Sequence, residues 1–245
     1  MADLGEQKRK AWEQEAGVST AIARAGGVAS YLTALPGWQK AFELRDRYLR
    51  CIDEGTPGGL HLAGSGILLD MGRAAETARA MRVEAVTYHD DCTEIINWGK
   101  TKNLLPGSEF EEAKKIYVRL AQELGVPLYK TELKRPEGLH AARVIYYDGT
   151  GSFDPSAVNG LPIGFVISRR YLKADYALSE VTMALDVAFG AHGFGEWFTR
   201  TTPLWLVVLG SRSLPSAKLI GELEPLVANR AGRVKIDELN LPWIK

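Results

Sequence analysis

The sequence predicts an α/β protein with a mostly parallel central sheet flanked by helices. Short apolar runs that suit buried strands alternate with longer segments of helical periodicity. The run from 204 to 209 has no polar residue, as expected of a strand that is buried on both faces. We find no internal repeat, low-complexity tract or long linker. The 245 residues are therefore interpreted as a single α/β domain.

The composition and net charge of the chain exclude some classes of function. Hydrophobic residues make up 46% of the chain, which allows one sizeable core, and 30 basic side chains balance 30 acidic ones. Because there is no net charge, nucleic acid and anionic membranes are not expected as partners, and a small-molecule substrate fits better. The N-terminus is polar, and no segment approaches about 18 consecutive apolar residues. We expect a cytoplasmic protein without a membrane span.

The first third is expected to be mainly helical. Residues 6–26 are rich in Ala, Glu, Lys and Arg and stop at Gly26, which indicates a helix. Its apolar face is thin, so we interpret residues 1–35 as an N-terminal helical arm that lies across a partner subunit. The other elements expected here are a helix over 38–47, strands over 48–52 and 60–64, and a helix over 65–82 with Ser65 as its N-cap.

The middle third alternates between strands and helices. Its clearest element is an amphipathic helix over 108–124, whose apolar residues recur at three and four positions until Gly125 ends it. The other elements expected here are a strand over 83–88, a helix over 93–98 and strands over 126–133 and 141–148. A turn at 148–151 follows the last strand.

Residues 156–245 are interpreted as a C-terminal α/β extension of a core at about 40–155. One face of the helix expected over 174–189 carries small and apolar residues at helical spacing. The remaining elements expected are strands over 161–168 and 204–209, a helix over 215–229 and a loose tail.

Both cysteines of the chain lie at the ends of expected strands. Cys51 ends the strand over 48–52, and Cys92 follows the strand over 83–88 three residues after His89. Active sites collect at the carboxyl ends of parallel strands. Two thiolates and one imidazole make three zinc ligands with a fourth position open, the arrangement of a catalytic zinc site. The alternative is two buried free thiols and a core histidine.

Other polar residues near these positions are candidates for proton handling. Asp53 lies two residues after Cys51 and points to the same side, so it is the candidate catalytic residue; the alternative is a turn aspartate. Glu54 either faces solvent or handles protons. His61 is either a proton shuttle or a partly buried core histidine, since apolar residues surround it. His140 is expected to face water.

The chain carries Cys-Ile-Asp at 51–53, Leu-Ala-Gly at 62–64 and His-Asp-Asp-Cys at 89–92. These motifs resemble those of the β-class carbonic anhydrases, which bind zinc through Cys, His and Cys with an Asp two residues after the first Cys. The resemblance runs from about residue 40 to about 155. It includes 144–151, which is similar to the family's closing edge strand and turn.

The resemblance implies a specific chemistry and assembly. Cys51, His89 and Cys92 would bind Zn²⁺, and Asp53 would accept a hydrogen bond from a zinc-bound hydroxide. The family fold is a parallel-sheet α/β fold, and the active site lies near a dimer interface, so a homodimer or higher homo-oligomer is expected. The activity implied is that of a lyase, the reversible hydration of carbon dioxide to bicarbonate.

One departure from the family pattern bears on activity. The family pairs its Asp with an Arg two residues further on, where this chain has Gly55. Without that Arg, Asp53 can swing in as a fourth zinc ligand and close the site, unless another arginine substitutes. Arg73 is the candidate substitute, although a solvated helix arginine is its alternative interpretation. Arg50 is expected to face the opposite way. Thr93 replaces the glycine that commonly follows the second zinc cysteine.

Three functional hypotheses follow. The first is a zinc-dependent carbonic anhydrase. The second keeps the fold and the zinc but hydrolyses another small electrophile, carbonyl sulfide or carbon disulfide. The third is a catalytically silent zinc protein of the same fold, in which Asp53 closes the site.

Overall fold

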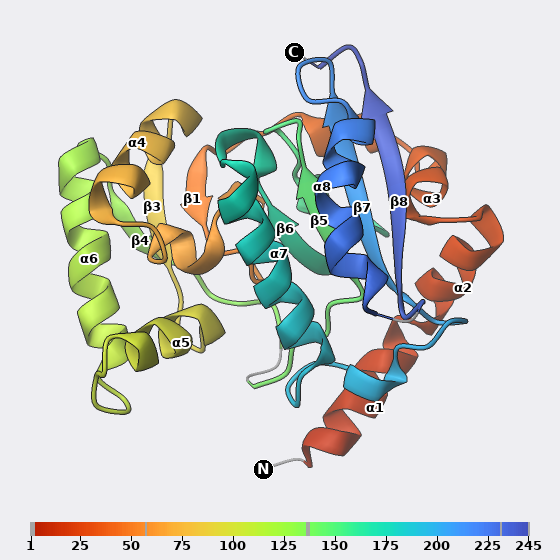
Figure 1. Ribbon diagram of the computed structural model, residues 1–245, viewed down its shortest axis with the longest axis horizontal. Coiled ribbons are helices and arrows are strands. Elements are labelled where there is room, and N and C mark those ends of the chain that lie inside the picture. The colour runs from red at the N-terminus through yellow and green to blue at the C-terminus, as the bar shows by residue number, and fades with distance from the viewer. Residues whose placement is uncertain (1–2, 57, 136–137, 231, 245) are drawn as a thin grey trace.

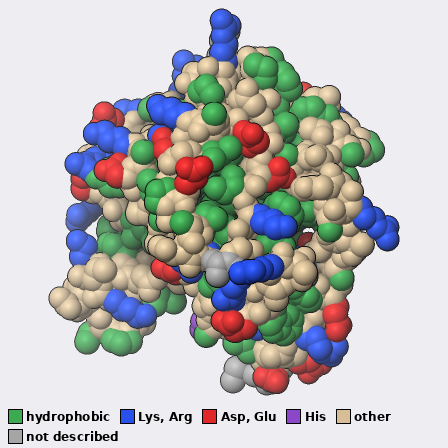
Figure 2. All heavy atoms as spheres, turned by 45° about the vertical axis from the view of Figure 1, so that its right-hand side comes forward, with side chains coloured by type: hydrophobic (Ala, Val, Ile, Leu, Met, Phe, Trp, Pro, Cys, Tyr) green, Lys and Arg blue, Asp and Glu red, His purple; other side chains and the backbone are tan. Residues whose placement is uncertain are grey.

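The structure is a computed structural model that describes residues 3–56, 58–135, 138–230 and 232–244 (Figure 1). Two four-stranded sheets, each with all of its strands parallel, are surrounded by α-helices. The predicted α/β class is confirmed, although the sheet is divided in two. Basic and acidic side chains are interspersed over the face in Figure 2, as the balanced composition leads one to expect.

The first sheet has the strand order β2-β1-β3-β4. Its strands are β1 (Tyr48–Arg50), β2 (Leu60–His61), β3 (Ala85–Tyr88) and β4 (Leu128–Lys130). The helices of this half are α4 (Met71–Met81), α5 (Thr93–Thr101) and α6 (Glu109–Leu124). Small alanine side chains on α4 and α6 are buried, which lets both helices pack closely with this part of the core.

The second sheet has the strand order β6-β5-β7-β8. Its strands are β5 (Val144–Asp148), β6 (Gly164–Ile167), β7 (Leu204–Ser211) and β8 (Val234–Leu241). The helices α7 (Ala174–Phe189) and α8 (Ser216–Ala228) lie in front of it in Figure 1. The opposite face packs against α2 (Ala16–Ala25) and α3 (Val28–Ala34).

The two sheets repeat one strand order. Numbered from the first strand of its own sheet, each reads 2-1-3-4, so the chain contains the same four-stranded unit twice. The units meet where β6 passes the loop after β1 and the end of β2. There the amide of Val166 donates to the carbonyl of Ile52, and that of Ser168 donates to His61, both at 3.2 Å. This repeat of topology is not visible in the residue types.

The N-terminal arm makes contacts with its own chain. It consists of α1 (Leu4–Gln14), α2 and α3, and Gly26 ends α2 with φ of +87°. The ring of Trp12 packs edge-on against Phe194 with 4.8 Å between centroids. The guanidinium of Arg143 lies 3.6 Å from the Trp12 ring centroid and 5.5 Å from that of Phe194.

Several predicted boundaries were wrong. The expected loose tail contains β8, which pairs with β7 over eight residues. The strand over 144–148 lies inside the second sheet, not at an edge of the first. The helix over 38–47 is only a short 3₁₀ turn. The described 3₁₀ helices are η1 (Trp38–Phe42), η2 (Ala63–Gly66), η3 (Pro155–Ala157), η4 (Arg169–Tyr171) and η5 (Gly195–Trp197).

The start of α4 also differs from the prediction. Ser65 is not its N-cap, because Ser65 lies in η2 with φ of +52°. The cap is Asp70, whose side chain accepts a hydrogen bond from the amide of Arg73 at 3.0 Å. Within the described part of the chain, no helix combines the length and apolarity needed to cross a membrane.

Candidate metal centre

Two neighbouring strands bring the predicted metal ligands together. β1 and β3 pair in parallel with Leu49 opposite Val86, so the residues that follow each strand meet at one edge of the sheet. Cys51 comes directly after β1, and His89 directly after β3. The chain then turns sharply and reaches Cys92, which precedes the first residue of α5.

The three side chains form a compact, buried set. One ligand atom from each of Cys51, His89 and Cys92 lies within 4.8 Å of the other two, and all three residues are at most 2% exposed. The sulfurs are 3.8 Å apart. His89 Nδ1 donates to the carbonyl of Asp90 at 2.6 Å, which leaves Nε2 as the unprotonated nitrogen, and Nε2 is buried without a hydrogen-bond partner.

This set fits zinc. With Zn–S bonds of about 2.3 Å, tetrahedral geometry separates two sulfurs by about 3.8 Å. Two thiolates and an imidazole are donors that zinc prefers over calcium or magnesium. Burial raises the pKa of the Cys51 thiol, but its contacts with Cys92 and His89 outweigh burial and hold the pKa well below its usual range. A lowered pKa favours the thiolate, which is the form that binds a metal.

Glu94 is a neighbour of the two sulfurs that sequence reasoning missed. Its Oε2 lies 3.4 Å from Cys92 Sγ and 3.9 Å from Cys51 Sγ. Burial, followed by the charges of Cys51 and Asp53, raises the pKa of Glu94 to about 8. The carboxyl group is therefore mainly protonated at neutral pH. The only available signal was its place in the first turn of α5, where glutamate is common for helix-dipole reasons alone.

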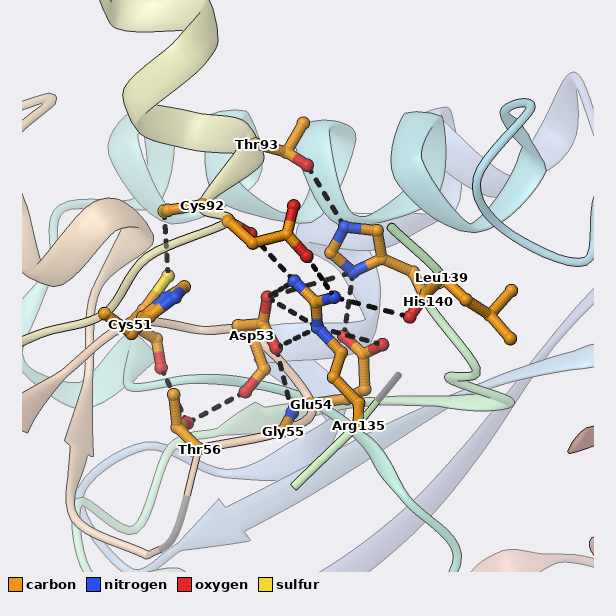
Figure 3. Close-up of polar contacts among 12 residues, drawn as sticks. Cys51, Asp53, Glu54, Gly55, Thr56, Cys92, Thr93, Arg135, Leu139 and His140 are labelled. Atoms are coloured by element: carbon orange, nitrogen blue, oxygen red, sulfur yellow. Dashed lines mark hydrogen bonds and ion pairs between the residues drawn. The ribbon is translucent and has the colours of Figure 1, made fainter. Parts of the chain in front are cut away.

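Asp53 is held by an arginine from a distant loop. Arg135 Nε lies 2.9 Å from Asp53 Oδ1, and Nη2 lies 2.8 Å from Oδ2, a bidentate pair in which both side chains are buried (Figure 3). The amide of Gly55 also donates to Oδ1 at 2.9 Å. Burial raises the pKa of Asp53, but the bonds and charge of Arg135 outweigh burial and lower it. Asp53 is therefore ionised and fixed.

The prediction that Arg73 replaces the missing arginine partner of Asp53 was wrong, because Arg135 has that position. Arg73 instead forms an ion pair with Asp70 at 3.1 Å at the exposed start of α4. Arg50 faces away as expected, since its Nε donates to the carbonyl of Gly58 at 2.7 Å. The missing side chain at Gly55 makes room for Arg135, because a Cβ there would lie 2.9 Å from Arg135 Cγ.

Glu54 and His140 form a second buried pair beside Asp53. Glu54 accepts hydrogen bonds from the amide of Ala141 at 2.9 Å and from His140 Nδ1 at 3.1 Å. His140 is 4% exposed, so the prediction that it faces water was wrong. Its other nitrogen, Nε2, lies 3.1 Å from the hydroxyl of Thr93.

Asp53, Glu54 and His140 form a second group of potential metal ligands, because one ligand atom of each lies within 4.8 Å of the other two. Arg135 lies among them, however, with its Nε 3.8 Å from Glu54 Oε1 as well as bonded to Asp53. A fixed cation at this position neutralises the carboxylates. We therefore interpret this group as an ion-pair network next to the metal centre.

Comparison with known proteins does not assign this chain to a family. No family model, curated protein or solved structure matches the chain. The resemblance to β-class carbonic anhydrases is carried by the motif residues of the sequence.

The C-terminal unit supplies walls of a cavity beside Asp53. This cavity of about 260 Å³ is lined by Asp53 and His61 of the first unit and by residues that include Val158 and Val166 of the C-terminal unit. His61 Nδ1 is 2.8 Å from the carbonyl of Cys51, and burial lowers the pKa of His61 to about 4. The imidazole is therefore neutral at pH 7, which favours the core-histidine interpretation over a shuttle.

Helix α7 of the C-terminal unit also reaches the first unit through Glu180. Its Oε1 accepts a hydrogen bond from the amide of Ala63 at 3.0 Å, and its Oε2 is buried without a partner. Burial, followed by the negative charges of Cys51 and Glu94, raises the pKa of Glu180 from 4.5 to about 8.

The raised pKa of Glu180 predicts a pH-dependent effect of its substitution. The unfolded chain loses this proton near pH 4.5 and the folded chain only near pH 8, so the contribution of Glu180 to folding weakens as pH rises between these values. Glu180→Gln removes the ionisation. The stability of the variant relative to the parent should therefore rise by up to about 1.4 kcal/mol per pH unit in this window. Urea unfolding at several pH values measures this difference, and a difference independent of pH would contradict the prediction.

Proposed function

We propose that this protein is a zinc-dependent carbonic anhydrase that catalyses the reversible hydration of carbon dioxide to bicarbonate. The observation that carries the proposal is the Asp53–Arg135 pair beside the set of Cys51, His89 and Cys92. Asp53 is not part of that set; it belongs to the separate group with Glu54 and His140. Because Arg135 holds the Asp53 carboxylate, a metal ion bound by Cys51, His89 and Cys92 would keep a fourth position open.

The residues around that position suit hydration chemistry. Cys51, His89 and Cys92 would hold a zinc ion, which would lower the pKa of a water molecule toward neutrality. Arg135 Nε and Nη2 and the amide of Gly55 occupy three of the roughly four acceptor positions of the Asp53 carboxylate. The remaining position can accept a hydrogen bond from the reacting water and orient it. Burial of the pair strengthens this bond relative to bulk water.

The surroundings favour a small substrate. The cavity beside Asp53 is about 260 Å³, and Val158, Leu161 and Val166 give it apolar walls. A small linear apolar molecule such as carbon dioxide fits this description. The resemblance implies an active site near a dimer interface, and we propose that the C-terminal unit takes that place within one chain. The silent-protein hypothesis required Asp53 to close the site, and Arg135 removes the reason for that closure.

The proposal is tested by stopped-flow measurement of carbon dioxide hydration with zinc-loaded protein between about pH 6 and 9. We expect one zinc per chain by elemental analysis and a rate that increases with pH. Cys92→Ser serves as the control that weakens the metal site, and its activity should be lost with its zinc.

Other outcomes separate the hypotheses. A protein without bound zinc would refute the proposal. Bound zinc without carbon dioxide hydration, together with consumption of carbonyl sulfide or carbon disulfide, would favour the alternative hydrolase. Bound zinc and no turnover of any of the three would support the silent protein.

A further inference from the structure

His140 connects the carboxylates of the site with a second hollow in the molecule. Its Nδ1 faces Glu54 Oε2 at 3.1 Å and Asp53 Oδ2 at 3.8 Å. Its Nε2 faces the hydroxyl of Thr93 at 3.1 Å, on the opposite side of the ring (Figure 3). The two nitrogens of one imidazole thus contact two different environments.

The hollow on the Nε2 side leads to the surface. It is a cavity of about 230 Å³ with Thr93 and His140 among its lining residues. Asp186 and His192 line the same cavity and are exposed to solvent. His140 is therefore almost fully buried and still borders a space that reaches water.

We propose that His140 is the proton shuttle of this site, carrying the proton released by hydration from the Asp53–Glu54 side to the cavity lined by Thr93. This inference depends on the proposed carbonic anhydrase activity. Each turnover converts carbon dioxide and water to bicarbonate and one proton. The ring accepts that proton at Nδ1. The protonated ring releases its Nε2 proton to cavity water, directly or through the Thr93 hydroxyl, which passes on its own proton in turn. Exchange of the remaining ring proton from Nδ1 to Nε2 through solvent then frees Nδ1 to accept the next proton. No oxidant or second substrate is needed.

The charges around His140 suit this role. Burial lowers the pKa of His140, but the hydrogen bond and charge of Glu54 and the charge of Asp53 outweigh burial and raise it, while Arg135 opposes the rise. From the other packed elements, α5 presents the neutral Thr93 hydroxyl, and the cavity presents Asp186 and His192. The uncharged ring of Phe165 on β6 lies 6.0 Å away. His140 can therefore hold a proton near neutral pH.

Oxygen-18 exchange between carbon dioxide and water tests the shuttle with the zinc-loaded protein. Mass spectrometry gives two rates: interconversion of carbon dioxide and bicarbonate, and release of labelled water, which requires proton transfer. In His140→Gln the ratio of water release to interconversion should fall about 10–100-fold. Added imidazole buffer should restore it, because a soluble base replaces the lost one. Zinc content and circular dichroism check that the variant is folded.

A second variant covers the case in which His140→Gln does not fold. Thr93→Val keeps the side-chain size and removes the hydroxyl next to Nε2, and it should lower the same ratio severalfold. An unchanged ratio in a folded variant, with normal interconversion in the parent, would overturn the shuttle and leave the proposed function standing. Absence of interconversion in the zinc-loaded parent would overturn both.

Discussion

Arg135→Ala is expected to retain zinc but to lose at least about 100-fold in carbon dioxide hydration. The substitution leaves the buried Asp53 carboxylate without its bidentate partner, and Asp91 loses the contact with Arg135 Nη1 at 2.9 Å. An uncompensated buried charge costs about 3–5 kcal/mol, so the free energy of unfolding should fall by a similar amount. A freed Asp53 can then turn toward the metal and close its open position. Elemental analysis, urea unfolding and stopped-flow kinetics measure the three effects.

Two further variants make this result specific. Arg73→Ala is the matched control, because Arg73 pairs with the exposed Asp70 near the start of α4 and lies over the ring of Tyr176. This variant should change neither activity nor zinc content. Combining Gly55→Arg with Arg135→Ala places a guanidinium two residues after Asp53, in the space that Arg135 leaves. This double variant should recover part of the activity. Full activity in Arg135→Ala alone would show that the pair has no part in catalysis.

Zinc is expected to stabilise the folded chain strongly. A ligand that binds only the native state adds about 4 kcal/mol when present at 1,000 times its dissociation constant. For a chain of this size, that corresponds to an increase in Tm of roughly 8–16 °C. Thermal unfolding of chelator-treated protein with and without added zinc measures the shift. Cys51→Ala removes one of the three ligands, so its Tm should respond little to zinc. An equal shift in this variant would place the bound zinc elsewhere.

The sequence was sufficient to predict that the three candidate metal ligands lie close together, because their signal is local. Cys51, His89 and Cys92 each follow a short apolar strand, and parallel strands end at a common edge. The helix over 174–189 was also predicted with its observed bounds, because its helical periodicity is continuous and Gly190 follows it.

The Asp53–Arg135 pair and the Glu54–His140 pair could not be predicted from local sequence patterns. Arg135 contacts Asp53 across 82 positions of the chain, and nothing in its neighbourhood marks it as buried. His140 follows the same polar loop, and only the fold places it against Glu54. The strand β8 was missed because the adjacent Asp237 and Glu238 interrupt its alternation of apolar and polar side chains. Contacts between distant segments depend on tertiary packing, which local patterns do not encode.

The two units share one strand order but contribute different parts of the candidate site. Both groups of potential metal ligands in the described residues come from positions 51–140, while the C-terminal unit contributes cavity walls and Glu180. Two separate subunits meet by mass action and separate on dilution. Here a covalent connection holds the units at a high effective concentration, so the walled site persists however dilute the protein becomes. A division of roles between the two units therefore does not depend on protein concentration.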